Sequence, residues 1–304
     1  MTQFKNMIFA FALFTASSTL CFAQVSASIS GRVEDPSGAA IPGATVTAIS
    51  SETGATRTVN TDEAGNFRLL ALPVGRYDLR SEKVGFKAAL QTGVNLVVGQ
   101  QAVVNLHLEV GAVQEEVTVT GEAPLVNTTT SSVAGLVGEK QVKELPLNGR
   151  SFDLLITLNA GAINYTSMKS PGPAGGNFFS VAGRRPSENL TLLNGVEYTG
   201  ASTVAITPGG VSGQLLGIDA VREYNVVSSA FSAEYGKRAG AQVTVVTQSG
   251  TNQLHGSAFE FLRNGKLDAR NFFDKGPVPA FKRNQFGGAL GGPIRKDHSF
   301  IFGN

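Results

Sequence analysis

The side chains of this sequence best suited to metal binding or catalysis are three histidines and one cysteine. Their spacing does not match any known metal-binding or catalytic motif. His107, His255 and His298 lie far apart, and none stands in an HExxH or HxxE pattern that would bring a second zinc ligand nearby. Neither a GxSxG nucleophile turn nor a GxxxxGKS/T phosphate loop occurs. The sequence therefore predicts no metal, no cofactor and no catalytic residues, and the protein is not expected to be an enzyme.

Two pairs of neighbouring cations are the candidates for contact with a bound molecule. Lys237 and Arg238 stand in the glycine-flanked segment 236–240, where a bend and two positive charges coincide, and Arg184 and Arg185 form the other pair. The net charge of the whole chain is only +2. Because so small a charge does not attract a polyanion strongly, no nucleic-acid partner is expected.

The elements that position these residues are expected to be mainly β-strands. The chain of 304 residues is 42% hydrophobic and 16% charged, which is enough to bury a core. It contains 36 glycines, no tryptophan and 3 methionines, a composition that favours short strands with tight turns over long packed helices.

Residues 1–23 have the features of a secretory signal peptide. Lys5 supplies the positive start, Met7–Leu13 the apolar run, and Ala23 a small residue before cleavage at Gln24. A retained anchor is disfavoured because a helical span needs about 20 apolar residues. Since the only cysteine, Cys21, lies in this segment, the mature chain is expected outside the cytoplasm and without disulfides.

Residues 25–110 are expected to form a β-sandwich. Turn signals recur between short alternating runs, and Val103–Val110 places apolar residues on one face of a half-buried strand. The segments Ser30–Val46, Thr61–Arg80 and Lys83–Phe86 resemble the carboxypeptidase regulatory-like, transthyretin-like fold. In that fold five apolar residues are expected to supply core: Phe67, Leu69, Leu72, Tyr77 and Leu79. The resemblance allows a structural spacer or a sugar-binding module, for which Phe86 is the candidate aromatic platform.

Residues 111–123 are expected to be a linker with one short strand. Valine and threonine alternate from Glu116 to Thr120 between acidic residues and Gly121. The segment is similar to the TonB box of TonB-dependent outer-membrane transporters, which pairs by β-addition with an energy-transducing protein. Its residues are Glu116, Val117, Thr118, Val119, Thr120 and Gly121. An extra strand of the preceding sandwich and a plain extended linker are the alternatives that the sequence leaves open.

Residues 124–251 resemble the α+β plug domain of the same transporters. Short helices are expected at Glu139–Glu144 and Ser151–Leu158, a hairpin turn at Asn194–Gly195, and a strand at Gln242–Thr247. The stretch Ala233–Gly256 is similar to the passage from plug to barrel wall. In such a plug, the cation pairs named above would meet a ligand or the barrel lumen, or would dock the plug electrostatically on the wall.

Residues 252–304 resemble the opening hairpins of an Oar-like TonB-dependent barrel. Phenylalanines at alternate positions in His255–Leu262 and Ser299–Gly303 are compatible with lipid-facing rings. A plugged barrel has about 22 strands, so this segment is expected to hold only the first strands of a truncated barrel.

The sequence as a whole therefore predicts the N-terminal portion of a TonB-dependent outer-membrane receptor. The resemblance implies a TonB-type partner, contact with outer-membrane lipid through the complete barrel, and energy-coupled uptake of an unidentified small ligand or polymer. It also implies a periplasmic location for the N-terminal domain. Two alternatives remain: a secreted carbohydrate-binding or adhesion protein built on the sandwich, and a peptidase-associated periplasmic enzyme, which the missing catalytic residues disfavour.

Overall fold

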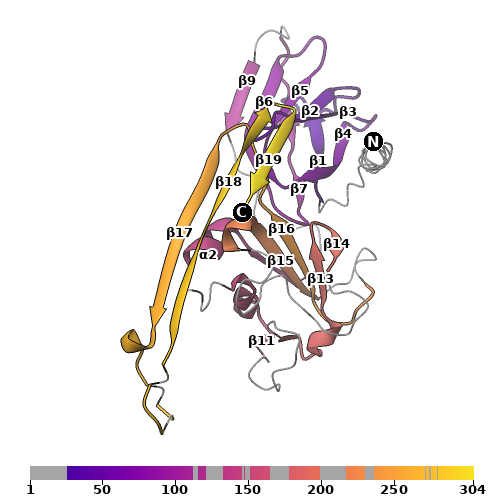
Figure 1. The fold of residues 1–304 in the computed structure, drawn as a ribbon. Helices are drawn as coiled ribbons and strands as arrows, with labels where there is room; N and C mark the ends of the chain where they lie inside the picture. The colour runs from indigo at the N-terminus through magenta and orange to yellow at the C-terminus, as the bar shows by residue number, and fades with distance from the viewer. Residues whose placement is uncertain are drawn as a thin grey trace, which may run out of the picture.

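The computed structural model in Figure 1 places three groups of strands around one long axis. It describes residues 26–111, 116–120, 133–145, 147, 151–164, 178–198, 217–229, 236–270, 272–273, 275–278 and 280–304. The sandwich lies at one end, a second unit lies below it, and a long sheet of β17, β18 and β19 runs beside both (Figure 1). The mainly β fold class predicted from the sequence is confirmed.

The sandwich consists of two sheets packed on one apolar core. Its strands are β1 (Ser26–Glu34), β2 (Thr45–Ser50), β3 (Thr56–Asn60), β4 (Asn66–Pro73), β5 (Gly75–Glu82), β6 (Ala88–Leu96), β7 (Gln101–Val103) and β8 (Leu106–His107). One sheet has the order β4-β1-β7, with β8 also paired to β1, and the other has the order β3-β2-β5-β6-β9. The five predicted core residues are all buried, because alternate side chains of both sheets point inward.

The prediction of one continuous strand at Val103–Val110 is wrong. The prediction of which of its side chains are buried is mostly right. The structure divides it into β7 and β8, both parallel to β1, with an isolated bridge at Val110. Leu106 and Leu108 are buried as predicted, whereas Val110 is 76% exposed. Where β7 ends, the carbonyl oxygen of Val104 lies so close to Gly31 that a Cβ on Gly31 would stand 1.8 Å from it. This position therefore admits only glycine.

The second unit is an α+β arrangement around a five-stranded sheet. Its elements are β10 (Val133–Val137), α2 (Glu139–Glu144), η2 (Phe152–Leu158), β11 (Ala162–Asn164), β12 (Phe179–Val181), η4 (Pro186–Glu188), β13 (Leu190–Leu193), β14 (Val196–Glu197), η5 (Ile218–Ala220), β15 (Val221–Ser229) and β16 (Gln242–Thr247). The sheet order is β10-β15-β16-β13-β14. Beneath it, η2 packs on the sheet through the ring of Phe152, whose centroid lies 5.9 Å from that of Tyr224.

Local signals predicted this unit well. The expected helix at Glu139–Glu144 is confirmed as α2, and the expected strand Gln242–Thr247 is confirmed as β16. The hairpin turn is also confirmed, since Asn194 and Gly195 both have positive φ, as a type I′ turn requires. The helix predicted after Ser151 forms as a 3-10 helix.

The hairpin sheet consists of β17 (His255–Asn264), β18 (Lys282–Arg295) and β19 (Ser299–Gly303), with η6 (Gly265–Leu267) after β17. One face exposes a row of large apolar side chains, each between 61% and 78% accessible: Leu262, Phe286, Leu290, Ile294 and Ile301. On the opposite face, Ser257 donates to the Asp219 carboxylate of the second unit at 2.7 Å. The hairpin sheet therefore has an apolar outer face and a face turned to the second unit.

The expectation of lipid-facing phenylalanine rings is wrong for these strands. Phe259 and Phe261 alternate with Ser257 and so share its inward face, and Phe302 stacks on His255 of the same face. Their rings fill space over glycine: a Cβ on Gly287 would meet the ring of Phe259 at 2.8 Å. The alternation of side chains is present as predicted. Only the strand pairing decides which face of the sheet each set of side chains occupies.

The expected signal peptide at residues 1–23 lies outside the described residues. Within the described ranges, no helix is long and apolar enough to span a membrane.

We expect Gly31→Ala to destabilise the sandwich by about 3 kcal/mol, because the added methyl group overlaps a backbone carbonyl that cannot move independently. Thermal unfolding of the chain measures the effect. Gly138→Ala is the matched control, since Gly138 has a φ of −82° and no atom within 4 Å of an added Cβ. Equal unfolding temperatures for the two variants would contradict the packing argument.

Candidate functional site

The strand that resembles a TonB box forms β9 (Glu116–Thr120), at the edge of a sandwich sheet. Its backbone runs parallel to β6, in register from Ala88 opposite Glu116 to Thr92 opposite Thr120. The alternative left open by the sequence, an extra strand of the sandwich, is therefore realised. Among the described strands nothing pairs with the outer edge of β9, so its backbone can accept another strand. Gly121 lies outside the described residues.

A bidentate ion pair joins the sandwich to the second unit. Glu52 follows β2, and Arg222 is the second residue of β15. The two guanidinium nitrogens of Arg222 donate to the two carboxylate oxygens of Glu52 at 2.8 and 2.7 Å. The side chains are 18% and 30% exposed, so water screens this pair less than a surface pair.

Next to this ion pair, β15 holds the turn that follows β6. The backbone N–H of Val98 donates to the carboxylate of Glu223 at 2.6 Å, and the side-chain amide of Asn225 donates to the carbonyl oxygen of Val98 at 3.3 Å. Glu223 is only 7% exposed, and this burial raises the pKa of its carboxyl group above the usual 4.5. Two side chains of β15 therefore provide hydrogen-bond partners for both the backbone N–H and the backbone carbonyl group of Val98.

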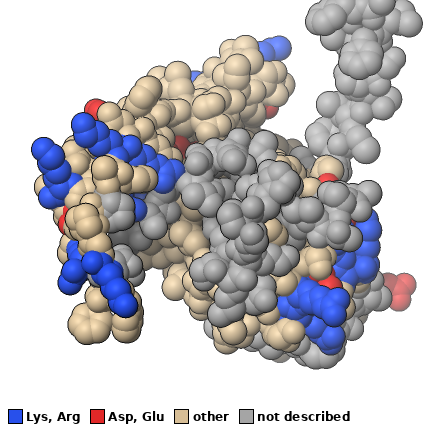
Figure 2. Space-filling view, turned by 60° about the horizontal axis from the view of Figure 1, so that its bottom comes forward, with Lys and Arg blue, Asp and Glu red and all other residues tan. Residues whose placement is uncertain are grey.

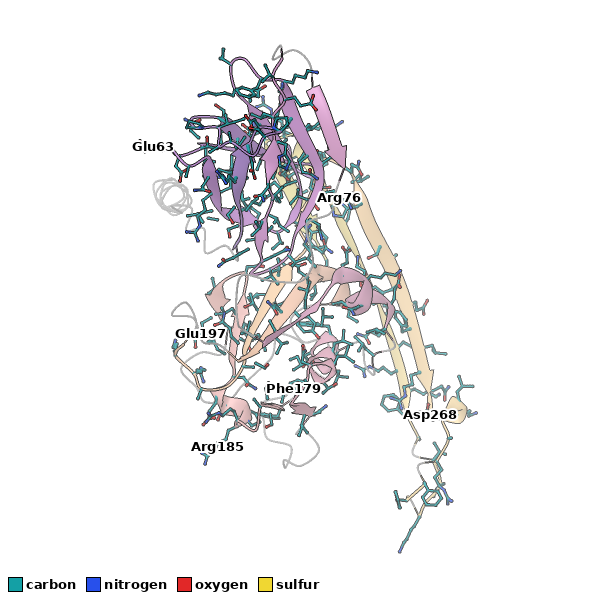
Figure 3. All side chains as sticks on the ribbon, turned by 180° about the vertical axis from the view of Figure 1, so that it is seen from behind. Glu63, Arg76, Phe179, Arg185, Glu197 and Asp268 are labelled. Carbon is teal, nitrogen blue, oxygen red and sulfur yellow. The ribbon has the colours of Figure 1, made fainter. Side chains whose placement is uncertain are left out.

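A third contact reaches the hairpin sheet. The backbone N–H of Asn252 donates to the carbonyl oxygen of Glu52 at 2.8 Å, and the Asn252 side chain exchanges two hydrogen bonds with Asp297, at 2.7 and 2.9 Å. Asp297 lies in the turn between β18 and β19. We call these three sets of contacts, made by Glu52, Val98, Arg222, Glu223, Asn225, Asn252 and Asp297, the junction. The backbone N–H of Ser51, next to Glu52, donates to the carbonyl oxygen of Arg76 at 3.0 Å, and Arg76 is labelled in Figure 3.

The junction was not anticipated from the sequence. Its charged members are ordinary single residues in turns and strands, and no local pattern marks them. The one hint lies in β15, where Arg222 and Glu223 stand side by side near the start of a strand whose middle contains Tyr224, Val226 and Val227. The folded chain brings Glu52 and Arg222 together across 170 positions, a separation that no spacing rule covers.

The cation pair Lys237 and Arg238 is engaged within the second unit. Both side chains contact the carboxylate of Glu197 in β14, and Arg238 also donates to the carbonyl oxygen of Ser187 at 2.7 Å. The ion pair with Lys237 is the main reason that the pKa of Glu197 lies below its usual value. Lys237 has a φ of 65°, so the bend predicted in this segment is present.

The other cation pair lies close by and faces outward. Arg184 and Arg185 are exposed, and the backbone N–H of Arg185 donates to the side chain of Glu188, 3.3 Å away, at the start of η4. Arg238 bonds the same short helix through Ser187. Figure 3 places Arg185 and Glu197 on the same side of the second unit. The structure therefore gathers the four predicted cations in one region.

The far end of the hairpin sheet carries a basic segment that we did not expect. Residues 263–283 contain six lysines or arginines and two aspartates, whereas the whole chain has a net charge of +2. Phe272 and Phe273 in this segment are 87% and 84% exposed. Figure 2, which views the molecule from this end, shows Lys and Arg side chains standing out from the surface. A running count of charge along the sequence would have revealed it.

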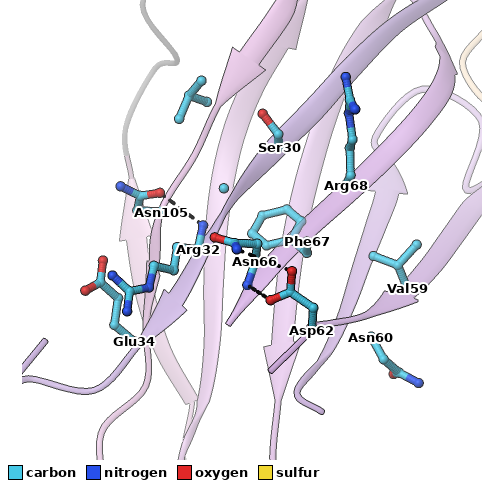
Figure 4. A pocket seen from close by; sticks show the side chains of 12 residues that line it. Ser30, Arg32, Glu34, Val59, Asn60, Asp62, Asn66, Phe67, Arg68 and Asn105 are labelled. Carbon is cyan, nitrogen blue, oxygen red and sulfur yellow. Dashed lines mark hydrogen bonds between the residues drawn. The ribbon is translucent and has the colours of Figure 1, made fainter. Parts of the chain in front are cut away.

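A groove of about 840 Å³ on the sandwich is the candidate position for a sugar site (Figure 4). Its polar groups are occupied in holding turns: Asp62 accepts backbone N–H bonds from Ala64 and Asn66, and Asn105 accepts one from Arg32. Phe67 is buried, and Phe86 packs against the core. Neither ring is presented as a flat platform in this groove.

Histidine, cysteine and acidic side chains do not gather in threes as a metal site in the described parts of the chain.

Comparison with known proteins gives two family matches. Residues 28–109 match the carboxypeptidase regulatory-like domain, and residues 246–304 match a family described as outer membrane beta barrel domain. Over 297 residues the chain is 28% identical to the TonB-dependent transporter Oar of Myxococcus xanthus, a similarity that covers 92% of this chain and 26% of the relative. The chain thus spans about a quarter of the relative's length. The resemblance to Oar-like receptors stated from the sequence is confirmed, and the matches indicate the outer membrane.

Two solved structures are similar to part of this chain. The siderophore receptor PirA from Acinetobacter baumannii has a TM-score of 0.39 and 19% identity, over 54% of this chain and 23% of that one. A mutant of the ferric enterobactin receptor PfeA from Pseudomonas aeruginosa has a TM-score of 0.37 and 16% identity, over 53% and 22%. Both TM-scores are below 0.5, so neither likeness carries a conclusion about this chain.

We expect the Glu52–Arg222 ion pair to contribute about 2 kcal/mol to docking of the sandwich, because it is bidentate and mostly shielded from water. A double-mutant cycle with Glu52→Gln and Arg222→Gln measures this coupling through hydrogen-exchange protection of the Val98 amide. The control is the Arg80–Glu82 pair, which is 44% and 39% exposed. The control coupling should stay below about 1 kcal/mol, and equal values for the two pairs would refute the prediction.

We also expect docking to weaken as pH rises through the raised pKa of Glu223. The docked state favours the protonated carboxyl group of Glu223. The contribution of this residue to docking is therefore fully present below pH 4.5 and is lost as the pH rises through its raised pKa. Glu223→Gln keeps an acceptor for the Val98 N–H and removes the titration. Above pH 4.5 the unfolding temperature should therefore depend less on pH in this variant than in the parent. An unchanged slope would count against the assignment.

Proposed function

We propose that this chain is the N-terminal portion of a TonB-dependent outer-membrane receptor, and that the complete protein takes up a ligand with energy supplied by a TonB-type partner. The observation that carries the proposal is the position of β9. In the chain this short strand lies between the sandwich and the second unit. In the structure it forms one edge of a sandwich sheet, with an outer side that no described strand pairs and that a partner approaching from the periplasm would reach. The similarity to a TonB-dependent transporter supports the same reading.

The hairpin sheet supports an orientation in the membrane. Residues 296–298 form a short turn between β18 and β19, whereas residues 265–281 form the long connection between β17 and β18. Outer-membrane barrels have short periplasmic turns and longer extracellular loops. Because Asp297 of the short turn belongs to the junction, the sandwich would lie in the periplasm. The basic segment 263–283 would then face the outside.

The second unit would act as the plug. It contacts the inward face of the hairpin sheet through the hydrogen bond from Ser257 to Asp219, while the apolar outer face of that sheet is left for lipid. The proposed domains are a signal peptide at 1–23, a sandwich at 25–110, a linker with the box at 111–123, a plug at 124–251 and the first barrel strands at 252–304.

The four predicted cations would have different roles in this plug. Lys237 and Arg238 are engaged with Glu197, so we assign them to the internal structure of the plug. Arg184 and Arg185 are exposed, and Figure 3 shows Arg185 on the side of the second unit that lies away from the sandwich. A small anionic ligand or an acidic polymer is the substrate class that their charge would attract.

We expect Val117→Pro to reduce capture of the partner's periplasmic domain by about tenfold or more, because proline lacks the backbone donor that a pairing strand uses. Photo-crosslinking to the purified partner domain measures capture. Val117→Thr is the matched control, since it keeps the backbone donor and the β-branched shape. Capture by the proline variant at the parent level would remove the TonB-box assignment and leave the plug assignment standing.

A further inference from the structure

We propose that the energy-transducing partner adds its strand to the outer edge of β9 while β9 remains paired with β6, so that the pull reaches the plug through the sandwich. This proposal rests on the proposed function and goes beyond it, because it makes the sandwich a coupling element and not a spacer.

The first step is the pairing of β9 itself. All five residues of β9 are in parallel register with β6, which is in turn bonded to β5 inside the sheet. The order β3-β2-β5-β6-β9 leaves the outer side of β9 as one edge of this sheet. A partner strand can therefore extend an existing sheet and does not have to order an isolated segment.

The second step is energetic. Each backbone hydrogen bond between β9 and β6 contributes about 1 kcal/mol, so a partner that displaced β9 would first lose several of these contributions. A partner that adds to the outer edge keeps them and gains its own ladder. Addition is therefore the lower-cost route to the same strand.

The third step is the connection from β6 to the plug. At Leu96, β6 ends and runs directly into the turn at residues 97–100, which is closed by a hydrogen bond from the Gln100 N–H to the Val97 carbonyl at 3.1 Å. Val98 in this turn is bonded on both polar groups by Glu223 and Asn225. A load on β9 thus passes through the ladder to β6 and through Val98 to β15.

A second attachment keeps the sandwich from turning about this point. Glu52 lies in a different turn and is bound by Arg222 of the same strand β15. The covalent route from β9 also leads to β15, because the chain next enters the sheet as β10, which pairs with β15. Both routes therefore load the same strand of the plug.

A pair of cysteines tests whether β9 stays on β6. Leu90 and Thr118 are register partners, so Leu90→Cys with Thr118→Cys should form a disulfide in the full 304-residue chain in detergent micelles. The control is Leu90→Cys with Val119→Cys, since neighbouring residues of a strand point to opposite faces. The single natural cysteine, Cys21, is replaced by serine in all variants. Failure of the in-register pair to form a disulfide would overturn the proposal.

Partner capture is then measured with the disulfide closed and after reduction. We expect the two values to agree within about twofold, because the partner uses the outer edge of β9. Capture that is abolished by the disulfide and restored by reductant would show displacement of β6 and overturn the proposal. Absence of capture in both states would instead remove the proposed function, and the disulfide would still report the β6 pairing.

The load path is tested by pulling on the captured partner domain with optical tweezers. Glu52→Gln combined with Asn225→Ala should lower the force at which the sandwich separates from the plug, and Arg80→Gln on the exposed sandwich surface should not. An unchanged force in the junction variant would show that the sandwich lies outside the load path and would overturn that part of the proposal.

Discussion

The arrangement of this protein depends on the strand β15, which has to satisfy polar groups from three directions. Its backbone pairs with β10 on one side and β16 on the other. At its start, Arg222 and Glu223 bind the sandwich, and both are largely buried. Because a buried charge without a partner costs several kcal/mol, the largely buried Arg222 is stabilised by the carboxylate of Glu52, which the sandwich supplies. The position of the sandwich therefore decides whether Arg222 of β15 has its ion-pair partner.

This constraint explains why the sandwich and the second unit form a polar junction where an apolar contact would also be feasible. An apolar contact tolerates small displacements, whereas a bidentate ion pair and a two-bond clamp on Val98 have narrow geometry. Such a junction is specific when closed, and water can satisfy its groups when it opens.

Sequence reasoning predicted local elements well where a single segment contained the whole signal. The Asn194–Gly195 turn, the helix α2 and the strand β16 needed only turn chemistry, a helix stop and a β-branched run. It was less successful at Val103–Val110, where pairing with β1 divided one expected strand into two. It also predicted the wrong face of the sheet for Phe259. An alternating sequence shows that neighbouring side chains point to opposite faces, but it does not say which set faces inward.

The sequence by itself determined the mainly β class, the buried residues of the sandwich and the existence of an alternating strand at Glu116–Thr120. It also contained the four cations and the resemblance that suggested their context. Only the tertiary structure decided that this strand lies on β6, that Lys237 and Arg238 are engaged with Glu197, and that Glu52 meets Arg222. The physical reason is that backbone pairing and ion pairing depend on distance in space. Residues far apart in the chain become neighbours only once the sheets that carry them have packed.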